Sequence, residues 1–209
     1  MGYFIDLVKN NSLNENIYID DSLVKPEEFD SKVIADGKKP IAVQQFQSLV
    51  DVIWYRYKKN KNCNLNDVDV REVRNFEYLF SNKQKFTISI GEDKGKKVNF
   101  KDFNGDISKW GTQYAHTFEG MFEGNKKFNG DISKWDLNMA DNIAYMFKNS
   151  NFNNKTPFET QLMGRLALRK DVFKGCPLEK KFGANGEGIF DSDMQKKLFD
   201  KAHKAFYGY

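Results

Sequence analysis

An octapeptide occurs twice without change in this chain, and this repeat constrains the fold more than any other feature. The copies are residues 103–110 and 128–135, both reading Phe-Asn-Gly-Asp-Ile-Ser-Lys-Trp, and they lie 25 residues apart. A period between about 20 and 50 residues is typical of proteins whose structural units stack and share one continuous core. Such stacks present an extended outer surface, so the repeat favours binding or assembly over catalysis.

The repeat extends beyond the octapeptide into a segment that ends in Met-Phe in both copies. Its apolar residues recur at i, i+4, i+7 and i+8, which predicts one buried face of a helix. These residues are Tyr114, Phe118, Met121 and Phe122 in one copy, and Met139, Ile143, Met146 and Phe147 in the other. Residues 65–80 and 152–178 fit the same frame less closely, so we count four units with degenerate outer members.

One unit reads as a turn, a short strand and a helix. Asn-Gly-Asp favours a turn, because Gly105 and Gly130 tolerate positive φ. Ile-Ser-Lys-Trp alternates as a strand does, and Asp136 or Asn138 is placed to cap the helix that follows. We therefore expect a core that contains Ile107, Trp110, Phe118, Met121, Phe122, Ile132, Trp135, Ile143, Met146 and Phe147.

Several of these stretches resemble a known repeat family. Residues 128–136, the Tyr-Met-Phe at 145–147 and the Phe-Lys-Gly-Cys-Pro-Leu-Glu-Lys at 173–180 resemble the BspA-type, or mycoplasma-lipoprotein-type, leucine-rich repeat, and residues 62–69 resemble its usual entry. The resemblance covers about residues 62–182. It implies a right-handed solenoid with a non-enzymatic role in adhesion or protein binding. Such repeats occur in surface proteins of gut and oral bacteria and mycoplasmas, and in phages of gut bacteria.

The expected fold class is therefore an α/β repeat solenoid. It is a short leucine-rich-repeat-like stack of about four turn–strand–helix units of ~25 residues, with an inserted β-hairpin and helical caps. The expected domains are an N-terminal arm (1–39), an N-terminal capping helix (40–62) that begins near Pro40, the repeat solenoid (63–182) and a C-terminal helix or tail (183–209). In the last of these, Met194, Leu198, Ala202 and Phe206 follow helical spacing after Asp191 or Ser192.

The segment at 83–102 interrupts the array between the first two units. Apolar residues alternate with polar ones over residues 86–90 and again over 98–100, around a turn with two glycines, and this predicts a β-hairpin. Because an isolated hairpin is marginally stable in water, we expect it to pack on the solenoid or on another chain. Lys94 and Lys96 near its tip are either partner contacts or solvated charges.

Composition and motifs give little support to catalysis or to nucleic-acid binding. The net charge is +4, but the basic groups at 56–61 and 165–170 lie beside acidic residues or at expected helix ends, so we expect no nucleic-acid partner. The chain has two histidines and no Cys/His spacing typical of zinc. The Gly-rich stretch at 182–188 fits neither phosphate-binding pattern. We expect no catalytic residues, no cofactor and no metal, and hence no enzyme.

The expected location follows from the cysteines and the first residues. Cys63 and Cys176 lie in the first and last units, too far apart for a disulfide in a stack, which fits a reducing cytoplasm. Residues 1–9 lack the pattern of a signal peptide, and no stretch approaches the roughly 18 apolar residues of a membrane span. We expect synthesis in a bacterial cytoplasm without a signal peptide, no membrane insertion, and a final location in a virion or, alternatively, the cytoplasm.

The partner that this sequence predicts is a protein. The leading hypothesis is a structural subunit of a large assembly such as a bacteriophage virion. The alternatives are an intracellular protein that binds and inhibits a host protein, and a bacterial surface adhesion module. Candidate contacts are Asp106, Lys109, Asp131 and Lys134, because repeated polar residues in register form a ladder on one side of a stack. The other interpretation of these charges is that they only keep the stack soluble.

Overall fold

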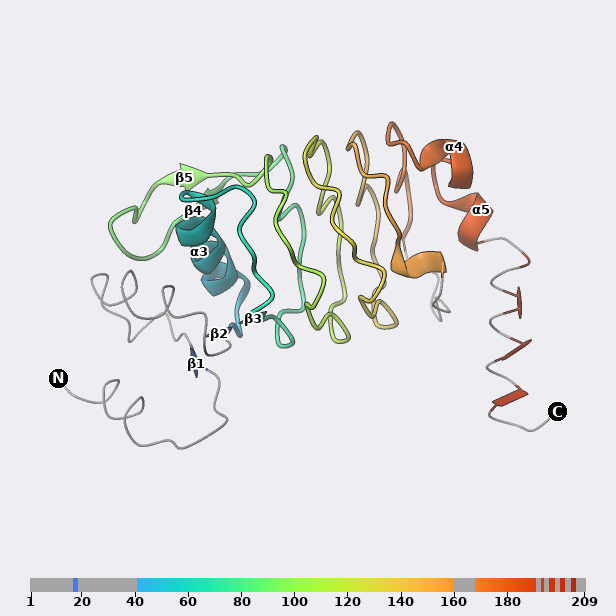
Figure 1. Cartoon of the computed structure of the whole chain (residues 1–209), viewed down its shortest axis with the longest axis horizontal. Helices are drawn as coiled ribbons and strands as arrows, with labels where there is room; N and C mark the ends of the chain where they lie inside the picture. Colours follow the sequence, from blue (N-terminus) through green and yellow to red (C-terminus); the bar gives the residue numbers. More distant parts are fainter. Residues whose placement is uncertain are drawn as a thin grey trace.

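Coils of chain lie side by side between helices at the two ends (Figure 1). The computed structural model describes residues 17–18, 41–159 and 168–190, together with 193, 196, 197, 200, 201, 204 and 205. Within these residues the protein is a mixed α/β chain with few short strands and helices around a large aromatic core. Helix α3 (Phe46–Tyr57) lies at one end of the coils, and α4 (Glu179–Phe182) and α5 (Glu187–Phe190) lie at the other.

A small parallel sheet stands beside the first coil. Its strands are β1 (Ile17–Tyr18), β2 (Ile41–Ala42) and β3 (Val68–Asp69), in that order. The N–H of Ile41 donates to the carbonyl of Asp67 at 2.7 Å. Because the chain pairs here as a strand, the predicted helix does not begin near residue 40 and α3 starts only at Phe46. Pro40 and the predicted N-terminal arm, apart from residues 17–18, lie outside the described residues.

The repeats stack as parallel coils joined by one backbone hydrogen-bond pattern. We call residues 75–82, 117–124, 142–149 and 168–175 the ladder segments. Parallel bridges join Asn75 to Thr117, Thr117 to Asn142, and Asn142 to Leu168. Alternate amides donate to the next coil, as in Phe76 N–H to the Thr117 carbonyl at 3.0 Å and Phe118 N–H to the Asn142 carbonyl at 2.8 Å. One sequence period therefore makes one coil.

The ladder segments contain tight turns where the sequence predicts helices, so that prediction is wrong. Met121 N–H donates to Phe118 O at 3.1 Å, and Gly120 has a positive φ of 56°. Amides that a helix would pair within itself are used between coils. The spacing imitates a helix because successive turns also return a side chain to the core every third or fourth residue. Tyr114 and Met139, expected in the buried stripe, are 46% and 40% exposed.

The octapeptide forms turns where a strand was expected. Ser108 N–H donates to Asp106 Oδ1 at 3.0 Å, and Asp136 Oδ1 accepts the N–H of Asn138 at 2.9 Å without a helix following. Gly105 does not have a positive φ. Glycine is required there because a Cβ would lie 1.9 Å from the Cys63 carbonyl oxygen of the preceding coil.

Aromatic rings form columns through the stack. The first contains Phe80, Phe122, Phe147 and Phe173, with successive ring centroids 5.6, 5.6 and 5.9 Å apart and nearly parallel planes. A second contains Phe103, Phe128 and Phe152, and a third contains Trp110 and Trp135 at 6.2 Å. Offset-stacked aromatic pairs stabilise by about 0.5–1.5 kcal/mol beyond their burial. The columns therefore give the stack a continuous core.

The ten residues named from the sequence as the expected core are all buried, and none is more than 3% exposed, in contrast to Tyr114 and Met139. They are Ile107, Trp110, Phe118, Met121, Phe122, Ile132, Trp135, Ile143, Met146 and Phe147. The two indoles also fix the register between coils. Trp110 Nε1–H donates to the Leu65 carbonyl at 2.9 Å, and Trp135 Nε1–H donates to the equivalent Ile107 carbonyl at 3.0 Å.

The segment at 83–102 forms an antiparallel hairpin that packs on its own chain. Strands β4 (Phe86–Thr87) and β5 (Lys97–Val98) pair with Phe86 opposite Val98. Tyr55 OH on α3 donates to the Ile90 carbonyl at 3.1 Å, and Asp51 Oδ1 accepts the Ser89 N–H at 2.8 Å. The hairpin therefore packs on α3 of its own chain.

Asp93 at the hairpin tip is the acidic anchor of this packing. Trp54 Nε1–H donates to Asp93 Oδ2 at 2.7 Å, and Lys58 Nζ lies 3.0 Å from the same oxygen. The indole hydrogen bond, followed by the one from Lys58, lowers the pKa of Asp93 to about 2. The hairpin is therefore held on α3 by a carboxylate that stays charged well into the acid range.

We expect Asp93→Asn to lower the free energy of unfolding at pH 6 and to flatten its pH dependence between about 4 and 2. The folded pKa lies below the unfolded value of about 3.9, so the charged carboxylate stabilises the fold above pH 4, and this contribution is lost as the pH falls through 2. Urea denaturation at a series of pH values measures the effect. Glu72→Gln is the control, because Glu72 is an exposed carboxylate that takes no part in holding the hairpin. Equal pH slopes for Asp93→Asn and wild type would contradict the assignment.

The other end of the stack is closed by short helices. Phe173 N–H in the last coil donates to the Ala184 carbonyl at 2.9 Å. Phe158 in η2 (Pro157–Glu159) packs edge-on against the Phe173 ring at 6.1 Å. Residues 193, 196, 197, 200, 201, 204 and 205 are helical and exposed, whereas the predicted stripe of Met194, Leu198, Ala202 and Phe206 lies outside the described residues.

Candidate functional site

The residues proposed from the octapeptide are exposed at the turns of two neighbouring coils. They are Asp106, Lys109, Asp131 and Lys134. The two aspartates build the turns themselves, because Asp106 Oδ1 accepts the Ser108 N–H and Asp131 Oδ1 accepts the Ser133 N–H at 2.9 Å. Hydrogen bonds from the same serines lower the pKa of both carboxyl groups. The lysines are the side chains that this edge presents to solvent.

The two hairpin lysines differ in their surroundings. Lys94 is exposed in the turn between β4 and β5. Lys96 Nζ lies 5.0 Å from the centre of the Trp54 ring and 3.4 Å from Asp93 Oδ1, so it takes part in packing the hairpin on α3. Of this predicted pair, Lys94 is the more available to a partner.

A second surface, which sequence reasoning missed, is formed by the part-exposed side chains of the ladder segments. We call it the ladder face. Its members are Glu77, Tyr78, Glu119, Tyr145, Lys148, Lys170, Asp171 and Lys174. Hydrogen bonds tie it across three coils, because Tyr78 OH donates to Glu119 Oε1 at 2.7 Å and Asn142 Nδ2 donates to Glu119 Oε2 at 2.7 Å. Burial and then the Glu119 carboxylate raise the pKa of Tyr78.

The far half of the ladder face is linked in the same way. Lys148 Nζ lies 3.0 Å from Asp171 Oδ2 and 4.6 Å from the centre of the Tyr145 ring. The hydrogen bond to Asp171 raises the pKa of Lys148. Lys170 also lies over the Tyr145 ring, at 6.0 Å. The ion pair with Asp171 and the contacts of both lysines with the Tyr145 ring therefore hold these side chains in place across adjacent coils.

Glycine makes room for the tyrosine of this face. A Cβ at Gly120 would lie 2.2 Å from the Tyr78 ring, so the ring rests directly on the backbone of the next coil. Gly124 has the same relation to Asn82, whose side chain lies 2.3 Å from a Cβ built there. Gly120 and Gly124 are the one sequence signal for this face. They do not recur with the octapeptide, because Tyr145 and Asn149 stand 25 residues later.

Charge changes sign along the ladder face. Carboxylates predominate in the first two coils, with Glu77, Glu119 and the nearly buried Glu123, which is 8% exposed. Lysines predominate in the last two, with Lys148, Lys170 and Lys174 around Asp171. Burial raises the pKa of Glu123. A partner that covers the whole face therefore meets an acidic half followed by a basic half.

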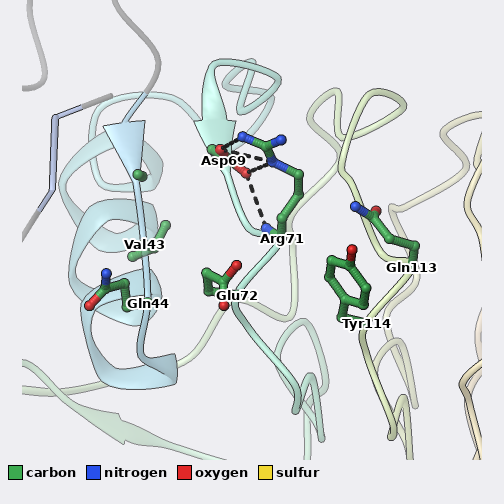
Figure 2. Close-up of a pocket in the computed structure, with 8 residues that line it drawn as sticks. Val43, Gln44, Asp69, Arg71, Glu72, Gln113 and Tyr114 are labelled. Atoms are coloured by element: carbon green, nitrogen blue, oxygen red, sulfur yellow. Dashed lines mark hydrogen bonds and ion pairs between the residues drawn. The ribbon is translucent and has the colours of Figure 1, made fainter. Parts of the chain in front are cut away.

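A pocket lies between the first sheet and the second coil (Figure 2). Its volume is about 280 Å³. It is lined by Ala42, Val43, Gln44, Asp69, Arg71, Glu72, Gln113 and Tyr114. Arg71 is bound to Asp69 on one wall, with Nη2 2.6 Å from Oδ2, and Tyr114 stands on the opposite side. Sequence reasoning missed this pocket, because its lining comes from three distant segments.

The described residues contain no cluster of three or more His, Cys, Asp or Glu side chains arranged to hold a metal ion. Cys63 and Cys176 are both buried as free thiols, and burial raises the pKa of each, that of Cys63 to about 11. Over the described ranges, no helix has the length and apolar composition that crossing a lipid bilayer requires.

Comparison with known proteins identifies the family. A family model described as "Mycoplasma protein of unknown function, DUF285" matches residues 43–156 and 97–177, which together span more than half of the chain. The chain belongs to this family. The family is related to mycoplasma-lipoprotein and BspA-like repeats, and its matches include both octapeptides and both halves of the ladder face. No curated protein and no solved structure gives a match.

Proposed function

We propose that this protein is a non-enzymatic protein-binding module, a short leucine-rich-repeat solenoid of the BspA type that contacts its partner through the ladder face. The repeated parallel junctions between coils support the solenoid assignment. The observation that carries the binding proposal is the hydrogen-bonded row of Tyr78, Glu119 and Asn142, which holds part-exposed polar groups in place across three coils.

The ladder face is suited to binding because its side chains are already ordered. Immobilising a flexible side chain at an interface costs about 0.5–1.5 kcal/mol, and a fixed side chain avoids most of that cost. Tyrosine is also enriched at protein interfaces, where its ring packs and its hydroxyl bonds. Tyr78 and Tyr145 supply such groups from two different coils.

The charge pattern sets the partner that this face prefers. Complementary charges fix register and speed encounter more than they raise affinity. The partner therefore presents basic groups opposite Glu77 and Glu119, and acidic groups opposite Lys170 and Lys174. Such a two-signed surface binds in one orientation, which a fixed subunit of an assembly requires.

The setting of the contact remains part of the proposal. As a structural subunit, for example of a bacteriophage virion, the chain is present in a fixed ratio in purified particles when their proteins are analysed by mass spectrometry. As an inhibitor of a host protein, it forms one soluble complex of simple stoichiometry. As an adhesion module, it is labelled on intact cells. These three observations separate the settings from one another.

Site-specific photo-cross-linking tests the face itself. A photoreactive phenylalanine analogue replaces Lys170 or Lys174 on the ladder face, and in matched variants it replaces Lys109 or Lys134 on the octapeptide edge. We expect one discrete cross-linked partner from the ladder positions, and charge reversal of Glu119 should reduce its yield. Cross-links from the octapeptide edge alone would move the interface there, and absence of any product from the ladder positions would reject the proposed face.

A further inference from the structure

Four polar side chains line the pocket between β2 and the second coil without hydrogen-bonding to any residue that the structure describes. They are Gln44, Glu72, Gln113 and the hydroxyl of Tyr114, in the pocket of about 280 Å³. Binding sites for small polar ligands are concave and carry a few convergent polar groups. Figure 2 shows Glu72 between the strand that carries Val43 and the coil that carries Tyr114. The pocket thus has unused hydrogen-bonding capacity.

The pocket is specific to this junction of the stack. Glu72, Tyr114 and Met139 occupy equivalent positions in successive coils, and so do Arg71, Gln113 and Asn138. Residues 42–44 form a further row beside residues 69–71, because β2 pairs in parallel with β3 in the register that joins Ala42 to Asp69. In the next coil the positions of Glu72 and Tyr114 are occupied by Tyr114 and Met139, so this combination of side chains is not repeated, and the next coil supplies matched control positions.

The Tyr114 ring forms an exposed side of the pocket and is held in place by Arg74. The Arg74 guanidinium lies 5.1 Å from the centre of its ring, and Arg74 Nη1–H donates to the Tyr114 carbonyl at 3.2 Å. The side chain is nevertheless 46% exposed, so it presents aromatic surface at the pocket. A fixed aromatic ring beside hydrogen-bonding groups is suited to a flat ligand with a polar edge.

The charges in and around the pocket disfavour an ionic ligand. Arg71 is neutralised by Asp69, to which its guanidinium makes hydrogen bonds of 2.6, 2.9 and 3.1 Å. Arg74 lies on the Tyr114 ring and repels a cation, while Glu72 repels an anion. The remaining carboxylate and amide groups accept and donate hydrogen bonds, which hydroxyl groups match because each both donates and accepts.

We propose that this pocket binds one sugar ring of a glycan, as a neutral polyhydroxylated ligand stacked on Tyr114 and hydrogen-bonded by Glu72 and Gln113. This inference goes beyond protein binding by the ladder face and does not depend on it. The pocket lies at the first sheet, and no residue of the ladder face lines it. Failure of one proposal leaves the other standing.

Amide chemical shifts of the isotope-labelled full chain test the site. D-Glucose, D-galactose, D-mannose and N-acetyl-D-glucosamine are titrated separately at millimolar concentrations. We expect at least one sugar to shift saturably the signals of residues 42–44, 69–72 and 113–114. Tyr114→Ala should weaken that sugar about tenfold, and Glu72→Gln should weaken it with the fold intact.

Met139→Ala and Asn138→Ala are the matched controls, and we expect them to leave sugar affinity unchanged. The proposal is overturned if no sugar shifts the pocket signals, or if Tyr114→Ala and Met139→Ala bind the sugar equally. It is also overturned if lysine methyl ester or inorganic phosphate shifts these signals at lower concentration than any sugar, because the pocket would then select charge.

Discussion

Trp135→Ala is expected to lower the free energy of unfolding by about 3–5 kcal/mol, the range for removing a large buried aromatic side chain. The Trp135 ring is fully buried and lies 6.2 Å from Trp110, 5.9 Å from Phe118 and 6.4 Å from Phe122. Its Nε1–H also donates to the Ile107 carbonyl at 3.0 Å. The substitution thus opens a cavity between two coils and removes one of the two hydrogen bonds that the Ile107 carbonyl accepts, leaving the one from the Trp110 N–H at 3.2 Å. Chemical denaturation followed by circular dichroism measures the loss.

Two controls separate the cavity from other effects. Trp135→Phe retains an aromatic ring but not the indole donor, so we expect a smaller loss than with alanine. Tyr114→Ala removes an exposed ring from the coil that precedes Trp135. We expect it to change the free energy of unfolding by less than about 0.5 kcal/mol. If Trp135→Ala cost no more than Tyr114→Ala, Trp135 would not belong to a core shared by successive coils.

Asn125→Leu is expected to lower the free energy of unfolding by roughly 3 kcal/mol, although the side chain keeps its branching and its number of non-hydrogen atoms. Asn125 is fully buried, and its Nδ2 donates to the carbonyls of Phe80 and Phe103 at 3.1 and 3.2 Å. Its Oδ1 accepts the N–H groups of Lys127 and Phe128 at 2.8 and 2.9 Å. Leucine leaves these four backbone groups without that partner, at about 1–3 kcal/mol for each one that stays buried and unbonded.

Asn151→Leu is the matched control for this prediction. Asn151 is exposed, and its Nδ2 makes one hydrogen bond to the Lys126 carbonyl at 3.1 Å. Water replaces that bond, so we expect a loss below about 1 kcal/mol. Similar losses for the two variants would mean that the four side-chain hydrogen bonds of Asn125, three of them buried, add nothing to the stability of the stack. Denaturation of both proteins under identical conditions makes this comparison.

The register of the coils is the part of the fold that the sequence predicted best. Two identical octapeptides 25 residues apart place Trp110 and Trp135 in equivalent surroundings, and their rings lie 6.2 Å apart with planes 9° from parallel. The apolar spacing likewise identified most of the buried side chains, with Tyr114 and Met139 as the exceptions. Both patterns depend only on which residues avoid water, and that property survives whatever path the backbone takes between them.

The path of the backbone could not be predicted from the sequence pattern. Apolar residues three and four apart fit a helix, and they equally fit successive turns whose amides bond to the next coil. The choice depends on whether a neighbouring coil is present to accept those amides, which no local window contains. Tyr78 and Tyr145 adopt φ values of 55° and 61°, a region that tyrosine rarely occupies. Their residue type therefore gave no sign of a turn.

The candidate sites were less predictable than the core. The ladder face depends on Tyr78 meeting Glu119 across a coil interrupted by the hairpin, and the pocket joins residues 42–44 to residues 69–72 and 113–114. Surface side chains follow no apolar period, because solvent accepts almost any polar residue. The octapeptide lysines could be proposed as contacts only because they lie inside the repeat that also sets the core.

Each coil presents the same row of carbonyl groups to its neighbour, so the protein can become longer by whole coils. A duplicated copy of residues 103–127 would meet its neighbours with the amides, indole and phenylalanine ring that they already accommodate. The hairpin shows that extra chain can also leave the array at a coil boundary and return in frame. Gene duplication can therefore extend such a protein and enlarge its exposed surface without requiring a new kind of contact between coils.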